Sequence, residues 1–178
     1  MFLSAKKLAF LGLLLACTVI IVILSGVLEF NSLFLLAGAS YLVGIAIREG
    51  GIRIGTGFYI ASLLLSLMLA PNKLYCITFI AMGLYLVISE YIYDKLAKIK
   101  RIGNRKRVYW IIKYVIFNLM YIPMLIFLPK LIYQGELNDR LWQALIPAGQ
   151  VALFVYDRAY NYFQKHVWEK VRGKLNLL

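Results

Sequence analysis

The charged residues of this 178-residue chain are spaced so that six long runs contain no charge at all. Each run is 16 to 21 residues long. Because an α-helix needs about 20 apolar residues to cross a bilayer core of about 30 Å, the longer runs suffice alone. The shorter runs end beside tyrosine or tryptophan, which sit at the headgroup level and extend each run by a turn. The spacing predicts six transmembrane helices, at about 8–28, 32–47, 54–71, 74–93, 109–128 and 141–162.

The composition agrees with a lipid environment. Hydrophobic residues make up 62% of the chain and charged residues 16%, whereas soluble domains average about 45–50% and about 25%. This apolar content excludes a disordered chain, and two cysteines exclude a disulfide scaffold. We therefore expect an all-α integral membrane bundle, multi-pass in the cell (inner or plasma) membrane, with the lipid bilayer as its first partner. The alternative is that four of these runs span the membrane and the other two form buried re-entrant segments.

The basic residues are distributed unequally between the two ends of the expected helices. If the N-terminus is cytoplasmic, all but three of the 20 Lys and Arg residues lie on the cytoplasmic side, the exceptions being Lys73, Lys130 and Arg140. The positive-inside rule therefore predicts that both termini are cytoplasmic. The segment 163–178 alternates basic and apolar residues, which predicts an amphipathic cytoplasmic tail on anionic lipid.

Residues that commonly build catalytic or metal sites are few. The single histidine, His166, lies in the basic tail, and Cys17 and Cys76 lie on different expected helices without the spacing of metal ligands. The net charge of +12 also suits nucleic acid, but no recognition motif accompanies it. We therefore expect no enzyme activity, no metal or other cofactor, and no nucleic-acid partner.

Polar residues at membrane depth predict contacts between helices, because hydrocarbon penalises them elsewhere. Asn118 and Gln150 lie midway along the last two expected spans and suit an interhelical hydrogen bond, or else the wall of a cavity. Lys113 lies near the inner boundary, where it needs a counter-charge, and Glu90 and Asp157 fall at similar depth. We expect Lys113 to contact one of these carboxylates in an ion-pair clasp. A proton or ion relay is the alternative.

The outer ends of the expected helices carry amides and aromatic rings but few charges. These groups hold planar, uncharged molecules by stacking and hydrogen bonding. They predict a small-molecule site near the outer connections 29–32, 71–75 and 130–142; the alternative is that the rings belong to the interfacial belt. The candidate ligand-binding residues are Asn31, Asn72, Tyr75, Trp142 and Gln143.

Several strings, taken together, resemble small membrane proteins of clostridia and related Gram-positive bacteria. These proteins in turn resemble the substrate-binding subunits of energy-coupling-factor vitamin transporters. The strings are Phe58-Tyr59-Ile60-Ala61-Ser62-Leu63-Leu64-Leu65-Ser66, Pro71-Asn72-Lys73, Ile112-Lys113, Phe117-Asn118, and Gln150 followed by Tyr156-Asp157.

The resemblance implies a six-helix fold that binds a small, vitamin-like molecule from outside. It further implies partner subunits, namely a transmembrane coupling subunit and ATPases. Small residues on the first helix dock the coupling subunit in that group, and Gly12 and Ala16 are the matching positions here; the pair is also a common helix-packing motif. The alternative function, from another class, is a non-transporting scaffold of the cell envelope with the same six-helix fold.

Overall fold

The computed structural model describes residues 4–28, 31–98, 104–127 and 139–175. Throughout these residues the protein is all-α, as expected from the sequence. The final long helix continues through a π-helical turn, η3 (Phe163–Trp168), into a short last helix. The α-helices are α1 (Ala5–Val27), α2 (Ser32–Gly50), α3 (Ile52–Leu69), α4 (Lys73–Lys98), α5 (Arg105–Phe127), α6 (Asp139–Tyr162) and α7 (Glu169–Leu175).

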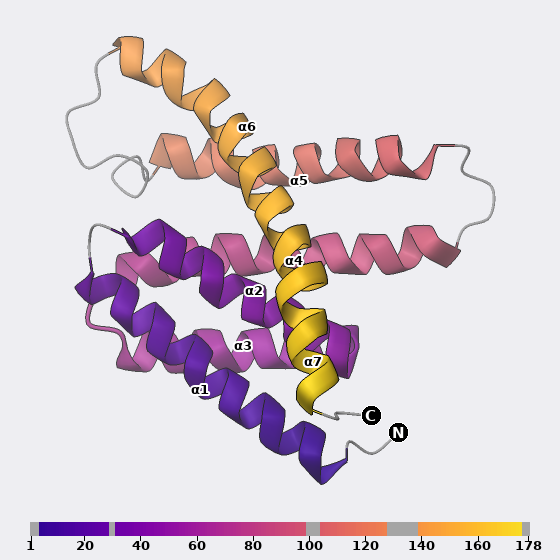
Figure 1. Cartoon of the computed structure of the whole chain (residues 1–178). Helices are drawn as coiled ribbons and strands as arrows, with labels where there is room; N and C mark the ends of the chain where they lie inside the picture. Colours follow the sequence, from indigo (N-terminus) through magenta and orange to yellow (C-terminus); the bar gives the residue numbers. More distant parts are fainter. Residues whose placement is uncertain (1–3, 29–30, 99–103, 128–138, 176–178) are drawn as a thin grey trace.

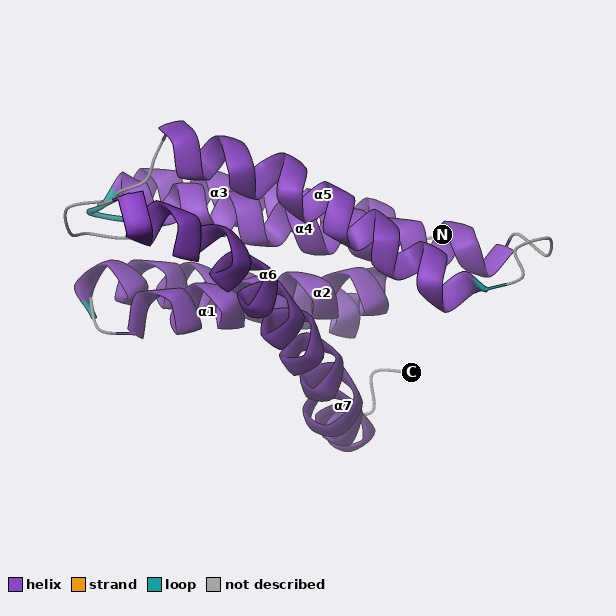
Figure 2. Ribbon diagram, turned by 90° about the horizontal axis from the view of Figure 1, so that it is seen from above, coloured by secondary structure: helices purple, strands orange, loops and turns teal. Residues whose placement is uncertain are grey.

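Five of the helices, α1 to α5, are long and apolar enough to cross a membrane. They run alongside one another, whereas α6 crosses them obliquely (Figures 1 and 2). The sequence of α6 is less apolar, because it includes Gln143, Pro147 and Gln150. The structure is therefore that of a membrane protein with five helices of spanning character and a sixth that lies across them.

Short connections explain why α1 to α4 pack as neighbours. Gly51 joins α2 to α3 with a φ of 81°, a left-handed conformation that glycine adopts without steric cost. Asn72 begins α4, where its side-chain oxygen accepts a hydrogen bond from the Leu74 amide at 3.0 Å. Both residues belong to turns that the sequence analysis placed between spans.

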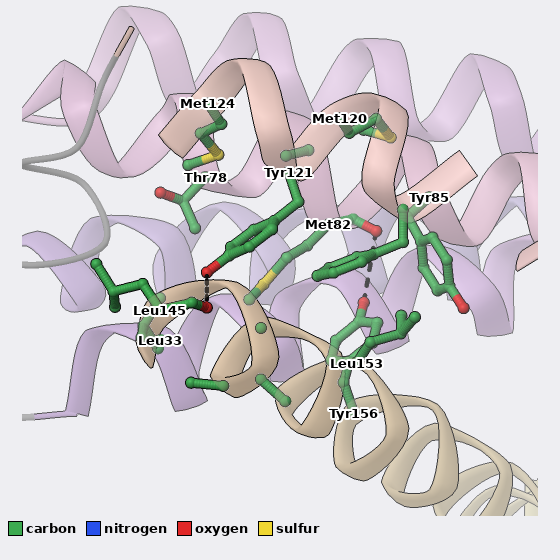
Figure 3. A pocket seen from close by; sticks show the side chains of 15 residues that line it. Leu33, Thr78, Met82, Tyr85, Met120, Tyr121, Met124, Leu145, Leu153 and Tyr156 are labelled. Atoms are coloured by element: carbon green, nitrogen blue, oxygen red, sulfur yellow. Dashed lines mark hydrogen bonds between the residues drawn. The ribbon is translucent and has the colours of Figure 1, made fainter. Parts of the chain in front are cut away.

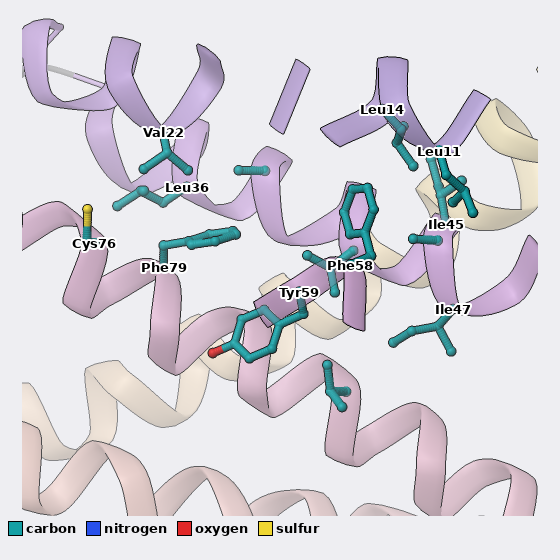
Figure 4. Close-up of a cluster of buried hydrophobic side chains, with 14 of the residues drawn as sticks. Leu11, Leu14, Val22, Leu36, Ile45, Ile47, Phe58, Tyr59, Cys76 and Phe79 are labelled. Carbon is teal, nitrogen blue, oxygen red and sulfur yellow. The ribbon is translucent and has the colours of Figure 1, made fainter. Parts of the chain in front are cut away.

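The main apolar core lies between α1, α2, α3 and α4. Leu36 and Phe79 are fully buried at its centre, with Phe58 and Tyr59 of α3 beside them (Figure 4). By contrast, only Lys113 and Leu125 are buried along α5. The helix α5 therefore lies at the edge of the bundle, beside α4, and depends on α6 for its remaining contacts.

The helix α6 is held against the bundle by glycines that permit close approach. A Cβ atom on Gly44 of α2 would lie 2.3 Å from the Tyr160 hydroxyl, and one on Gly149 of α6 would lie 2.4 Å from the Tyr121 ring. Gly44 thus leaves room on α2 for a neighbouring helix. That neighbour is the end of α6.

Candidate ligand cavity and its buried ion pair

A cavity of about 270 Å³ lies between α2, α4, α5 and α6. Figure 3 shows methionine and tyrosine side chains converging on it from α4, α5 and α6. Because α6 crosses the bundle obliquely, it cannot fill the space beside α4 and α5 along its whole length. The cavity is lined by Leu33, Thr78, Ala81, Met82, Tyr85, Phe117, Met120, Tyr121, Met124, Leu145, Ala148, Gly149, Ala152, Leu153 and Tyr156.

The wall of the cavity is almost entirely apolar. Two of its three tyrosines direct their hydroxyl groups to protein partners. The hydroxyl of Tyr121 donates to the Leu145 carbonyl at 2.8 Å, and that of Tyr156 lies 2.7 Å from the Ser40 hydroxyl. Methionine side chains are flexible and polarizable, so Met82, Met120 and Met124 suit a wall that adapts to its contents.

The cavity lies in the half of the bundle that contains the first turn of α2 and the 70–72 connection. Its lining residues come from the beginning of α2, the first half of α4 and the second half of α5. At the opposite end, the ring of Tyr85 contacts those of Phe117 and Tyr156, with centroids 6.5 Å and 5.9 Å apart. These three rings close the cavity toward the middle of the bundle.

A buried ion pair lies beyond this aromatic floor. The ammonium group of Lys113 on α5 donates to Oδ1 of Asp157 on α6, and the two side chains are 3% and 2% exposed. Asn161 donates to the other carboxylate oxygen at 3.0 Å, and the Tyr109 ring centroid lies 4.2 Å from the ammonium nitrogen. This is one of the two contacts expected for Lys113.

The other candidate carboxylate, Glu90, has different partners. Its Oε1 atom accepts hydrogen bonds from Arg48 of α2 at 2.9 Å and from the Tyr160 hydroxyl of α6 at 2.6 Å. The expected single clasp of spans four to six therefore consists of two separate clusters. The second cluster reaches α2, because α6 crosses α2 and α4 rather than running parallel to α5.

Asn118 and Gln150 meet as an amide pair between α5 and α6. Gln150 donates to the Asn118 oxygen at 2.7 Å, and Asn118 donates in return at 3.3 Å. Neither amide is among the residues that line the cavity. The interhelical hydrogen bond is present, and Asn118 also lines a separate, open groove along α5.

Four of the five candidate ligand-binding residues, Asn31, Asn72, Tyr75 and Gln143, are not among the described residues that line the cavity. Asn31, Asn72 and Gln143 are exposed, and Tyr75 packs beside Gly26, next to the main core. The side chain of Trp142 lies outside the described residues. The cavity is formed instead by apolar residues that the sequence analysis did not select, because apolar residues at membrane depth carry no signal that separates a cavity wall from a packed core.

The small residues of α1 remain uncovered in the described chain. A Cβ atom on Gly12 would meet no atom within 4 Å, and Ala16 on the same face is exposed. The side chains thus leave a shallow, smooth strip on α1. Docking of a partner at Gly12 and Ala16 stays a prediction.

The tail is anchored to the bundle rather than lying free. Trp168 is buried, its ring stacks on Phe10 of α1, and its indole nitrogen donates to Glu49 at 3.1 Å. Arg172 pairs with the same carboxylate at 3.0 Å. The exposed basic side chains of the tail therefore extend from a helix that α1 and α2 hold in place.

Comparison of the chain with protein-family models, with curated proteins and with solved structures finds no match. What the fold and the site define by themselves is an all-α membrane protein with an apolar cavity beside a buried ion pair.

Proposed function

We propose that this protein is the membrane-embedded binding subunit of an uptake transporter for a small, uncharged molecule. The single observation that carries the proposal is the cavity between α2, α4, α5 and α6. Natural sequences pack their interiors closely, so a space of about 270 Å³ beside the packed core of α1 to α4 suits an occupant.

The size and chemistry of the cavity limit that occupant. A dry apolar cavity of about 150 Å³ binds benzene, so about 270 Å³ suits a molecule of roughly two fused rings. The apolar wall offers dispersion contacts and ring stacking. A vitamin-like ligand of this site is therefore mostly hydrocarbon or aromatic.

We include six spans with cytoplasmic termini in this proposal. The 24 residues of α6 extend about 36 Å at about 1.5 Å per residue. Transmembrane helices tilt by up to about 40°, and at a tilt of about 30° α6 still spans about 31 Å, enough to cross a bilayer core of about 30 Å. The positive-inside count of the sequence supports the same topology.

We base the proposed transport step on the resemblance to substrate-binding subunits of energy-coupling-factor transporters. In that arrangement, a transmembrane coupling subunit and ATPases act on the loaded subunit. The exposed strip at Gly12 and Ala16 favours such docking and equally favours the second candidate function, a non-transporting envelope scaffold that binds partner proteins. The two differ in whether the cavity holds a ligand.

Ligand retention tests the binding function directly. Native mass spectrometry of protein purified from its own membranes should show a bound small molecule. Ala81 is half-buried on α4 and lines the cavity, so Ala81→Phe fills it and should remove that mass. Ala61 is half-buried on α3 outside the cavity, so Ala61→Phe is the matched control and should retain it.

Two further readouts keep this test decisive. Size-exclusion chromatography shows whether each variant is folded and monodisperse before its mass spectrum is interpreted. Wild-type protein that carries no small molecule, or Ala81→Phe protein that retains it, would refute the binding proposal. Co-purification of ATPase and coupling subunits from the same membranes would support transport, and a ligand-free complex with envelope proteins would support the scaffold.

A further inference from the structure

We infer that the ligand of this cavity is a lipophilic molecule dissolved in the bilayer, which enters sideways between α2 and α6. This inference rests on the proposed binding function and adds the route of entry and the class of ligand. It differs from capture of a water-soluble molecule at the outer surface.

The first argument is the position of the cavity mouth. Near Tyr156, α6 contacts α2 through hydrogen bonds to Ser40 and from Tyr41. Toward its first residues α6 diverges from α2, as both views show (Figures 1 and 2). Leu33, on the first turn of α2, lines the cavity and is 53% exposed. The two helices thus meet at one end and leave the cavity open at the other.

The second argument is the size of the side chains at this mouth. Ala148 and Ala152 of α6 both line the cavity and are both exposed. Because they are one turn apart, they form one small-residue edge. No bulky side chain of α6 covers the cavity there, so its contents face the surroundings of the helix, which at membrane depth are lipid.

The third argument is the scarcity of polar groups in the wall, where Thr78 is the one polar residue besides the tyrosines among the described lining residues. The hydroxyls of Tyr121 and Tyr156 are bonded within the protein. Figure 3 shows the Tyr85 hydroxyl pointing away from Leu33 and Leu145. A charged or strongly polar molecule would lose its hydration with little replacement, at a cost of several kcal/mol per group. An uncharged hydrocarbon or aromatic molecule pays no such desolvation cost on moving from lipid into this wall.

A small photoreactive probe tests this inference in proteoliposomes. The uncharged probe is 3-phenyl-3-(trifluoromethyl)diazirine, and its charged counterpart is the 4-carboxylate of the same compound, added to the aqueous phase. After irradiation, mass spectrometry maps the labelled residues, with trifluorotoluene as an unreactive competitor. Leu64, which is 55% exposed on α3 and lines no cavity among the described residues, reports non-specific labelling from lipid.

The uncharged probe should label Met82, Met120 and Met124 in a way that the competitor saturates, whereas Leu64 labelling should not saturate. The charged probe should not label the methionines. A cavity occupied by phospholipid chains would show no saturable labelling, because the surrounding lipid is already in excess.

A matched pair of variants tests the route. Ala152→Trp places an indole in the mouth and should lower saturable methionine labelling by about tenfold or more, consistent with the cost of overpacking a filled site. Ala159 is exposed on α6 but does not line the cavity, so Ala159→Trp should leave labelling unchanged.

The outcomes separate this inference from the proposed function. Saturable labelling by the charged probe, or labelling that Ala152→Trp leaves unchanged, would overturn entry from the bilayer while preserving a binding cavity. Absence of saturable labelling by both probes would overturn the binding function itself, and the inference with it.

Discussion

The buried pair of Lys113 and Asp157 is the interaction whose loss should damage the fold most. Replacing one partner leaves an uncompensated charge in a site where the side chains are 3% and 2% exposed. Breaking such a buried pair from one side costs about 3–5 kcal/mol. The change Lys113→Met should approach the upper value, because the carboxylate then retains only the Asn161 amide at 3.0 Å among its described donors.

The change Asp157→Asn should cost less than Lys113→Met. The ammonium group would still lie 4.2 Å from the Tyr109 ring centroid and 5.6 Å from that of Trp110, and cation–π contacts are worth about 0.5–2 kcal/mol. The amide oxygen of the new asparagine also accepts a hydrogen bond. We expect a loss of about 3 kcal/mol, the lower end of the range for breaking a buried pair.

The double variant K113M/D157N completes the cycle, because it removes both charges together. Exchanging a buried pair for neutral groups of similar volume is often close to neutral, so the double variant should be more stable than either single variant. The assay is thermal unfolding in detergent, where about 1 kcal/mol shifts the midpoint by about 2–4 °C in a chain of this size. Single variants within about 0.5 kcal/mol of wild type, the range of ordinary surface changes, would refute the reasoning, as would additive losses in the double variant.

Three other changes test separate parts of the structure. Gly149→Val should separate α6 from Tyr121 and cost about 1–3 kcal/mol, whereas Gly12→Val, with nothing within 4 Å of its new Cβ, should leave the melting temperature unchanged. Tyr156→Phe removes a hydroxyl that bonds across to α2 and should cost about 1 kcal/mol by the same assay. Asn104→Cys, in a background without the two native cysteines, should be inaccessible to an impermeant thiol reagent in intact cells; labelling there would contradict the predicted topology.

The sequence predicts the surroundings of a residue where those surroundings depend on how deep in the membrane the residue lies. The charge-free runs predicted the helices because lipid excludes charges whatever the neighbours are. Depth alone likewise required a counter-charge for Lys113, and Asp157 lies at the matching depth on α6. The amide pair of Asn118 and Gln150 follows from the same reasoning.

What the sequence could not reveal depends on the angle at which α6 crosses the other helices. That angle brings Tyr160 to Glu90 and opens the cavity beside Ala148, and neither follows from helix periodicity. The composition of α6 contained one hint, since Gln143 and Pro147 make it less apolar than α1 to α5. The cavity wall consists mostly of apolar residue types, and the same types pack the interior of other membrane bundles. The sequence therefore does not distinguish the wall from a packed core.

The oblique helix also has a consequence for how the chain is made. Three groups on the earlier helices, Ser40, Glu90 and Lys113, find their α6 partners only after the last long helix has been synthesised. Lys113 and Asp157 are 44 positions apart in the chain, which at about 5–20 residues per second separates their synthesis by roughly 2–9 s. During that interval the ammonium group of Lys113 lacks the carboxylate that neutralises it in the finished fold. The final packing of α5 thus depends on the arrival of α6.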